Sequence, residues 1–248
     1  MRELNKNKIL ENLPINRLNL DIFTEIDSTN DEAKRINLVK DFHIIIAEKQ
    51  NAGRGRLGKK WSSPESNNIY MTICTEIDLS FAPLSVIIGL ICKEAIEEIS
   101  KKSEIKLKWP NDILHKNKKI GGILVEKEIH NDDEVRSIIG IGINLNIKKE
   151  ESWWGDLSEF SIEAKRNELI NQILSDFIEK SDKLDFNWMD EWKNSCIHMN
   201  KKIKINNGDT FEKEAIFLGV DKNGNAIVKT DQGKELISSG EISIKGIY

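Results

Sequence analysis

The chain has few cysteines and few prolines, and it lacks long apolar segments. Its 248 residues include 3 cysteines and 4 prolines. Cys74, Cys92 and Cys196 are odd in number and far apart, which argues against a disulfide framework and against a cysteine metal site. No apolar run approaches the roughly 18 residues that a membrane span needs, and the first residues lack the apolar core of a signal peptide. We therefore expect a cytoplasmic protein that does not enter membranes.

The chain also lacks an excess of positive charge. Its formal net charge is −4, with 39% hydrophobic and 31% charged residues, which is typical of a folded globular protein. Any positive patch must therefore be local. About twenty residues precede the first predicted strand, too few for a three-helix DNA-binding unit. We therefore expect no binding to DNA.

The hydrophobic periodicity predicts an α+β fold. Alternating or β-branched runs predict strands at residues 21–26, 42–50, 69–77, 105–109, 118–129 and 134–147, with a turn at 130–134. Helices are expected at 80–102, capped by Ser80, at 161–184 and at 185–195. A capping box at Ser28–Asp31 or Thr29–Glu32 predicts one more helix. These elements favour a mixed, mostly antiparallel sheet with segregated helices.

The pattern changes after residue 197. Short alternating runs follow, separated by turn signals such as DKNGN and DQGKE. Such a pattern predicts a small antiparallel β-barrel of about fifty residues. We therefore expect two domains, at residues 1–197 and 198–248.

The segment GRGRLG, from Gly53 to Gly58, has the spacing of two known nucleotide-binding loops. A dinucleotide fingerprint would continue into a helix, but Pro64 and a Ser/Asn run follow. The further motifs of a protein kinase are absent from the sequence. Arginines and glycines can still bind an anion through guanidinium and backbone N–H groups. A flexible, solvated charged loop remains the alternative.

Two later segments combine polar residues with glycines. In KWPNDIL, Pro110 follows a predicted strand and presents Asn111 and Asp112 at a turn. The segments KKIGGILVE and GIGINLN then place glycines inside predicted strands. Glycine weakens a strand unless something must approach its backbone closely. Two such strands side by side would form a slot that admits a flat, amide-like ring.

These segments carry a resemblance to a known family. STN after a strand, AEKQNAGRGRLGKKWSSP, KWPNDIL, KKIGGILVE and GIGINLN stand in the order found in biotin protein ligases. The C-terminal segment GVDKNGNAIVKTDQGKELISSGEISI also resembles the small terminal barrel of that family. The resemblance covers the chain from about residue 22 to its end, and its motifs are long. It implies a catalytic domain like that of class II aminoacyl-tRNA synthetases, an SH3-like C-terminal barrel, and the monofunctional type without an N-terminal DNA-binding domain.

The resemblance also implies a reaction in two steps. Biotin would be activated by ATP to biotinyl-5′-AMP, with Mg²⁺ held mainly through the ATP phosphates. Biotin would then be transferred to a lysine of a biotin carboxyl carrier protein. Family members are monomers or dimers, so a homodimer is possible.

The family motifs assign roles to individual residues of this sequence. The resemblance implies catalytic roles for Lys119, Arg56 and Asp112, with Asp112 orienting or deprotonating the acceptor amine. The implied biotin-binding residues are Ser28, Thr29, Asn30, Gln50, Arg54, Gly55, Arg56, Lys119 and Gly122. The implied ATP-binding and adenylate-binding residues are Arg54, Arg56, Lys59, Trp61, Asn111, Lys119, Asn144 and Trp154.

Several assignments keep a structural alternative. Ser28 and Thr29 could merely cap a helix. Trp61 could be only a core aromatic that closes the loop, and we favour that reading. One of Trp153 and Trp154 is expected to stack on adenine while the other only packs. Two other functions also remain open, namely a lipoate or octanoate ligase on the same fold and a biotin-binding module without activity.

Overall fold

The structure is a computed structural model of the whole chain. It describes residues 3–79, 83–101, 104–129, 135–147, 151–183, 187–206, 212–239 and 243–246. The predicted cap Ser80 and the predicted turn at 130–134 lie outside these residues.

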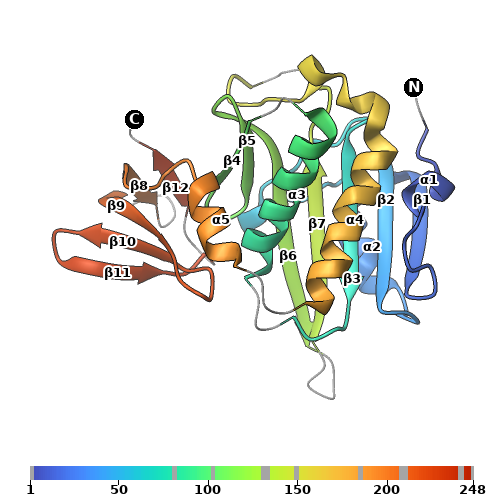
Figure 1. Cartoon of the computed structure of the whole chain (residues 1–248), viewed down its shortest axis with the longest axis horizontal. Coiled ribbons are helices and arrows are strands. Elements are labelled where there is room, and N and C mark those ends of the chain that lie inside the picture. Colours follow the sequence, from blue (N-terminus) through green and yellow to red (C-terminus); the bar gives the residue numbers. More distant parts are fainter. Residues whose placement is uncertain are drawn as a thin grey trace.

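A seven-stranded sheet forms the larger part of the molecule (Figure 1). Its order is β1-β2-β3-β7-β6-β5-β4. Only β1 and β2 run parallel among the described pairs, so the prediction of a mixed, mostly antiparallel sheet is confirmed. The strands are β1 (Leu18–Ile26), β2 (Phe42–Gln50), β3 (Ile69–Thr75), β4 (Ile105–Lys108), β5 (Asp112–His115), β6 (Lys118–Ile129) and β7 (Val135–Ile143).

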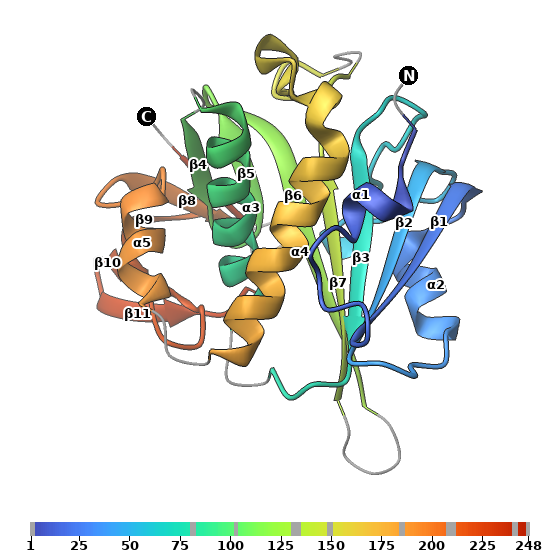
Figure 2. The same ribbon diagram turned by 45° about the vertical axis from the view of Figure 1, so that its right-hand side comes forward.

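Helices cover both faces of this sheet. Figure 2 shows α3 (Leu84–Ser100) and α4 (Arg166–Asp182) lying across one face, whereas α2 (Thr29–Arg35) lies on the other. Alternation along β2 explains this arrangement, because successive side chains point to opposite faces. Ile44 and Ile46 pack in the large core, while Ile45 packs with Ala33 of α2. The shorter helices are α1 (Lys6–Ile9) and α5 (Trp188–Ser195).

Local side-chain and backbone features determine where the helices α2 and α4 begin. Ser28 caps α2, and its side chain accepts a hydrogen bond from the Asp31 N–H, as the capping box predicted. The helix expected from residue 161 was placed too early. Ser161 has φ 51°, a left-handed conformation that cannot start an α-helix. A single 3₁₀ turn at Ile162–Lys165 follows, and α4 begins only at Arg166.

The C-terminal strands form a separate antiparallel sheet of five strands, in the order β11-β10-β9-β8-β12. The predicted small antiparallel β-structure is therefore confirmed, while the domain boundary at residue 197 stays a prediction. A backbone bridge joins Leu107 of β4 to Cys196, which directly follows α5. The strands are β8 (Lys202–Asn206), β9 (Glu212–Val220), β10 (Ala226–Thr230), β11 (Gly233–Ile237) and β12 (Ser243–Gly246).

The three cysteines are all buried and free. Burial raises the pKa of the Cys74 thiol to about 11 and that of Cys196 to about 12. These thiols therefore stay protonated near neutral pH and act as small apolar side chains. Among the helices of the described ranges, none is long and apolar enough to cross a membrane.

Trp109, in the turn between β4 and β5, makes a buried hydrogen bond to the turn between β9 and β10. Its indole Nε1 donates to the Gly224 carbonyl at 2.9 Å, and the side chain is fully buried. Trp109→Phe should lower the free energy of unfolding by about 1–3 kcal/mol, because it leaves that carbonyl without its partner. Urea denaturation measures the change. The control Trp153→Phe, at a side chain 54% exposed, should cost less than about 0.5 kcal/mol. Equal losses would contradict the role of Trp109.

Candidate active site

A single pocket collects the residues that the sequence singled out. It has a volume of about 390 Å³ and lies where the N-terminus of α2, the loop after β2, and strands β5, β6 and β7 meet. Every predicted site residue lines it, although their individual roles stay predictions. These residues are Ser28, Thr29, Asn30, Gln50, Arg54, Gly55, Arg56, Lys59, Trp61, Asn111, Asp112, Lys119, Gly122, Asn144 and Trp154.

The floor of the pocket is made by the paired strands β6 and β7. Gly122 lies directly opposite Gly142 in their antiparallel register. The indole of Trp61 rests on both glycines. A Cβ at Gly142 would come within 2.7 Å of that ring, and one at Gly122 within 3.3 Å. The expected slot between glycine-bearing strands is therefore present, with an aromatic ring against it.

Trp61 itself corrects our expectation. It is half-buried and lines the pocket rather than the core. Its indole Nε1 is buried and has no hydrogen-bond partner among the described residues. The preceding loop brings it there, because the Trp61 N–H donates to the Gly53 carbonyl at 2.9 Å. A Cβ at Gly53 would lie 2.5 Å from the Trp61 carbonyl oxygen, so this close approach requires glycine.

The GRGRLG loop folds back on itself instead of opening a helix. The Gly55 N–H donates to the Lys59 carbonyl at 2.7 Å, and Arg54 and Lys60 form a backbone bridge. A single 3₁₀ turn between them places Leu57 at φ 56° and Gly58 at φ 70°. No helix follows before β3, so the sequence-based exclusion of a dinucleotide fingerprint is confirmed.

Uncharged polar groups form one end of the pocket. Gln50 Oε1 accepts hydrogen bonds from the Thr29 N–H at 2.9 Å and from the Thr29 hydroxyl at 3.1 Å. Gln50 Nε2 donates to Ser63 Oγ at 2.9 Å. The buried Thr72 hydroxyl lies 2.7 Å from Asn30 Oδ1, to which it donates. These fixed donors and acceptors can recognise a compact, uncharged polar group.

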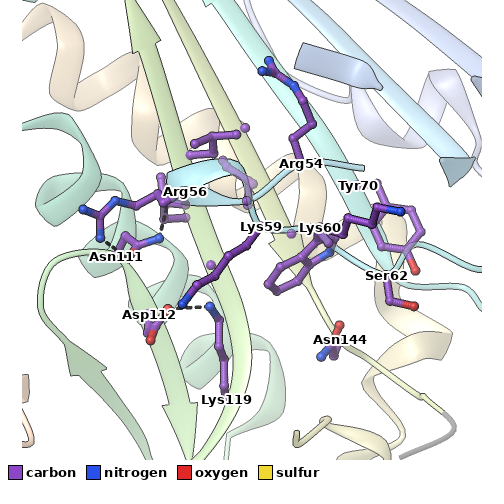
Figure 3. A pocket seen from close by; sticks show the side chains of 18 of the residues that line it. Arg54, Arg56, Lys59, Lys60, Ser62, Tyr70, Asn111, Asp112, Lys119 and Asn144 are labelled. Atoms are coloured by element: carbon purple, nitrogen blue, oxygen red, sulfur yellow. Dashed lines mark hydrogen bonds and ion pairs between the residues drawn. The ribbon is translucent and has the colours of Figure 1, made fainter. Parts of the chain in front are cut away.

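The opposite end is cationic. Lys119 Nζ lies 2.6 Å from Asp112 Oδ1, and Lys108 Nζ lies 3.5 Å from Asp112 Oδ2. Figure 3 shows the Lys59 side chain pointing toward the same carboxylate. The Lys119 ammonium also lies 5.3 Å from the Trp61 ring centroid, within range of a cation–π contact. Among the described residues that line the pocket, Asp112 carries the only carboxylate.

Arg56 extends this cationic end toward the C-terminal sheet. Its Nη1 donates to Asn111 Oδ1 at 3.3 Å, and its Nη2 donates to the Ser239 carbonyl. Burial lowers the pKa of the Arg56 guanidinium, and the charge of Asp112 opposes that shift. Asn111 in turn donates from Nδ2 to the Ile123 carbonyl at 2.8 Å, which fastens the turn to β6.

Arg54 is placed differently from the other cations. Its guanidinium pairs with Asp31 at 2.9 Å and with Glu126, and Figure 3 shows it pointing away from Asp112 and Lys119. The sequence suggested a donor to a phosphate or carboxylate of a ligand. In the structure this guanidinium is already engaged by two carboxylates of the protein.

The segment after β7 closes the side of the pocket near Lys119. The Lys119 N–H donates to the Trp153 carbonyl at 3.0 Å, and the Gly155 N–H donates to the Lys119 carbonyl at 2.8 Å. Asn144 Nδ2 donates to the Gly155 carbonyl at 3.2 Å. Trp153 and Trp154 pack edge to face, with ring centroids 5.7 Å apart, and both line the pocket. The assignment of Trp154 to the nucleotide stays a prediction.

Sequence reasoning missed four residues of this region. Lys108 is the first residue of the KWPNDIL segment, so the sequence could have predicted its position beside Asp112. Tyr70 also lines the pocket, and burial raises the pKa of its hydroxyl. Thr72 and Glu126 do not line the pocket but form hydrogen bonds with Asn30, which does. Only the strand register reveals those contacts.

Comparison with known proteins agrees with this architecture. Residues 22–144 match the biotin/lipoate A/B protein ligase family, and residues 198–245 match the biotin protein ligase C-terminal domain. The Escherichia coli bifunctional ligase/repressor BirA is 31% identical over 233 residues, covering 89% of this chain and 72% of that protein. The chain belongs to the biotin protein ligase family.

Other members of the biotin protein ligase family are similar over most of this chain. The biotin–[acetyl-CoA-carboxylase] ligase of Paracoccus denitrificans is 25% identical, covering 89% of this chain and 98% of that protein. The structure of the Aquifex aeolicus biotin protein ligase in complex with biotin and ATP aligns with a TM-score of 0.76 and 28% identity. That alignment covers 92% of this chain and 99% of the other. The expectations of no DNA binding and of a possible homodimer stay predictions.

The glycine floor gives a direct test of the pocket. Gly142→Ala should lower the affinity for biotin at least about tenfold, because the new methyl group would displace the Trp61 indole. Calorimetric titration with biotin measures this. Gly89→Ala in α3 is the control, since its Cβ would meet only Leu107 at 3.7 Å. Equal affinities for the two variants would show that the floor does not shape the ligand site.

Proposed function

We propose that this chain activates biotin with ATP to biotinyl-5′-AMP and transfers the biotin to a lysine of a biotin carboxyl carrier protein. One observation carries the proposal. A single pocket combines an uncharged polar end, at the N-terminus of α2, with a cationic end around Lys119. A neutral ureido ring suits the first end, and the second suits two reacting anions. Membership of the biotin protein ligase family supports this assignment.

The first step joins two anions. A carboxylate oxygen of biotin forms a bond to the α-phosphorus of ATP, the bond from that phosphorus to the bridging oxygen breaks, and pyrophosphate leaves. Cations must offset the repulsion and stabilise the charge that develops on phosphorus. Lys119 is our candidate for this contact, because its backbone is fixed on both sides by the Trp153–Gly155 segment. Arg56 is assigned to the adenylate product.

The second step transfers the acyl group. The amine nitrogen of the acceptor lysine forms an amide bond with the acyl carbon, the bond from that carbon to the phosphate oxygen breaks, AMP leaves with the electron pair of that bond, and the proton lost by the amine passes to water. Both oxygens of Asp112 are engaged by lysine ammonium groups. Bound phosphates would compete for Lys119 and Lys108, which frees Asp112 to accept a hydrogen bond from the incoming amine. We propose that Asp112 orients that amine.

The remaining pocket residues are assigned by position. We propose that Ser28, Thr29, Asn30, Gln50, Gly55 and Gly122 contact the biotin ring. Lys59, Trp61, Asn111, Asn144 and Trp154 are proposed to contact the nucleotide. Within the described part of the chain, no group of three or more His, Cys, Asp or Glu residues could hold a metal. This fits a Mg²⁺ ion that is bound mainly through the ATP phosphates, where it would supply charge neutralisation.

The setting of the reaction is also a proposal. An acceptor domain on a biotin-dependent carboxylase is the expected partner. The three buried free cysteines support a reducing compartment such as the cytoplasm. A homodimer is compatible with the position of β1 as an end strand of the sheet.

The proposal is tested by incubating the chain with biotin, MgATP and a biotin carboxyl carrier domain, with intact-mass readout. The carrier should gain the mass of one biotinyl group. Lys119→Ala should abolish this gain, because the main cation at the reacting centre is lost, while circular dichroism stays unchanged. Lys118→Ala, at the exposed neighbouring position, should behave as the wild type. Modification by lipoate or octanoate instead of biotin would point to the other ligase activity.

Arg56→Gly should loosen the adenylate within the pocket. The variant loses both the guanidinium and its tie to Asn111 and Ser239, so the reactive mixed anhydride should escape into solution more often. Labelling of an unrelated lysine-rich protein should rise by about tenfold relative to carrier labelling. A streptavidin blot measures this ratio. Unchanged or lower bystander labelling would contradict the assignment of Arg56.

A further inference from the structure

Glu126 lies on the pocket side of β6 but is not one of the residues that line the pocket. It stands on β6, two residues beyond Leu124 and four beyond Gly122, both of which line the pocket. Alternation along a strand places these three residues on the same face. The Glu126 side chain is 22% exposed, so it is largely withdrawn from solvent. The proposed reaction gives this carboxylate no role.

Three donors from two other segments converge on Glu126. Asn30 Nδ2 of α2 donates to Oε2 at 2.9 Å, and Lys34 Nζ of α2 donates to Oε1 at 2.8 Å. Arg54 Nη2, from the loop at residues 51–62 that contains GRGRLG (the glycine loop), also donates to Oε2. Burial alone would raise the Glu126 pKa, but the bonds from Lys34, Asn30 and Arg54 outweigh it and lower the pKa to about 2. The carboxylate is therefore ionised throughout the physiological range.

The hydrogen bond between Asn30 and Glu126 fixes the orientation of the Asn30 amide. Its Nδ2 donates to Glu126, while its Oδ1 accepts from the Thr72 hydroxyl at 2.7 Å. The amide also lies against the backbone of β7, where a Cβ at Gly140 would come within 2.3 Å of Oδ1. The amide cannot flip without exchanging both partners, so Asn30 presents one fixed arrangement of donor and acceptor to the pocket.

The ion pair between Arg54 and Glu126 holds the glycine loop. Arg54 reaches from that loop to Glu126 on β6 and to Asp31 on α2. Its guanidinium is thus the contact that ties the loop to the sheet and to α2 at this point. The loop also carries Arg56 and Trp61, which line the pocket. Anchoring Arg54 therefore restricts the part of the loop that covers the ligand site.

We propose that Glu126 is a positioning residue, which orients the Asn30 amide and anchors the glycine loop through Arg54. The inference rests on the proposed function only in naming biotin as the ligand. Since Glu126 does not line the pocket, it acts on binding and loop order rather than on the reacting atoms. Its loss should raise the KM for biotin and increase motion of the loop, with little change in kcat.

The matched variants are Glu126→Gln and Glu128→Gln. Glutamine keeps the size of Glu126 but removes the charge that pairs with Arg54 and Lys34. Glu128 lies on the same face of β6, opposite Arg136, and outside the bonds made by Glu126. We expect Glu126→Gln to raise the KM for biotin at least about tenfold, with kcat within about threefold of the wild type. Glu128→Gln should match the wild type in both.

Amide hydrogen exchange of residues 51–62 in the ligand-free protein measures how firmly Glu126 anchors the glycine loop. These amides should exchange at least about tenfold faster in Glu126→Gln than in Glu128→Gln, and Arg54→Gln should reproduce that increase. Unchanged exchange together with an unchanged KM would overturn the proposal. A wild type that shows no biotin binding would contradict the proposed function instead, and loop exchange would still decide the role of Glu126.

Discussion

The pairing of β6 with β7 is the constraint on which the rest of the site depends. It sets Gly122 opposite Gly142 and so leaves a bare strip of backbone within an otherwise apolar sheet. The Trp61 indole can lie on that strip only because neither position has a side chain. The same strand β6 carries Lys119 at one end of the strip and Glu126 on the same face further along. The register of β6 and β7 therefore places the slot for the ring, and β6 also carries Lys119 and Glu126, the residue that anchors the covering loop.

Charge is distributed around this floor in a way that suits the joining of two anions. A protein with a net charge of −4 gathers Lys108, Lys119 and Arg56 around a single carboxylate, that of Asp112. Without a ligand, Asp112 offsets part of this positive charge and keeps the lysine side chains in place. Phosphate groups would take over that role and release Asp112. The cations are thus held in position before the substrates arrive, so little reorganisation is needed during the reaction.

The sequence predicted much of this arrangement, and its limits have physical reasons. Several local signals each led to a correct structural expectation. They are the glycines inside strands, Pro110 before a polar turn, and the residues after GRGRLG that cannot open a helix. The start of α4 was placed too early because only the left-handed backbone of Ser161 shows where the helix can begin. The prediction that Trp61 is a core aromatic was wrong, because the sequence pattern of an aromatic residue after a loop is the same whether the ring packs in a core or against glycine-bearing strands. Arg54 and Glu126 stand 72 residues apart, and their pairing depends on the folded register.

The central claim is that one pocket activates biotin by joining its carboxylate to the α-phosphate of ATP. Biotin-dependent exchange of labelled pyrophosphate into ATP tests that claim most directly, because it needs neither the carrier domain nor the second step. We predict exchange with biotin and MgATP, and none when lipoate or octanoate replaces biotin. The account is contradicted if a folded preparation that retains ATP shows no exchange in the presence of biotin.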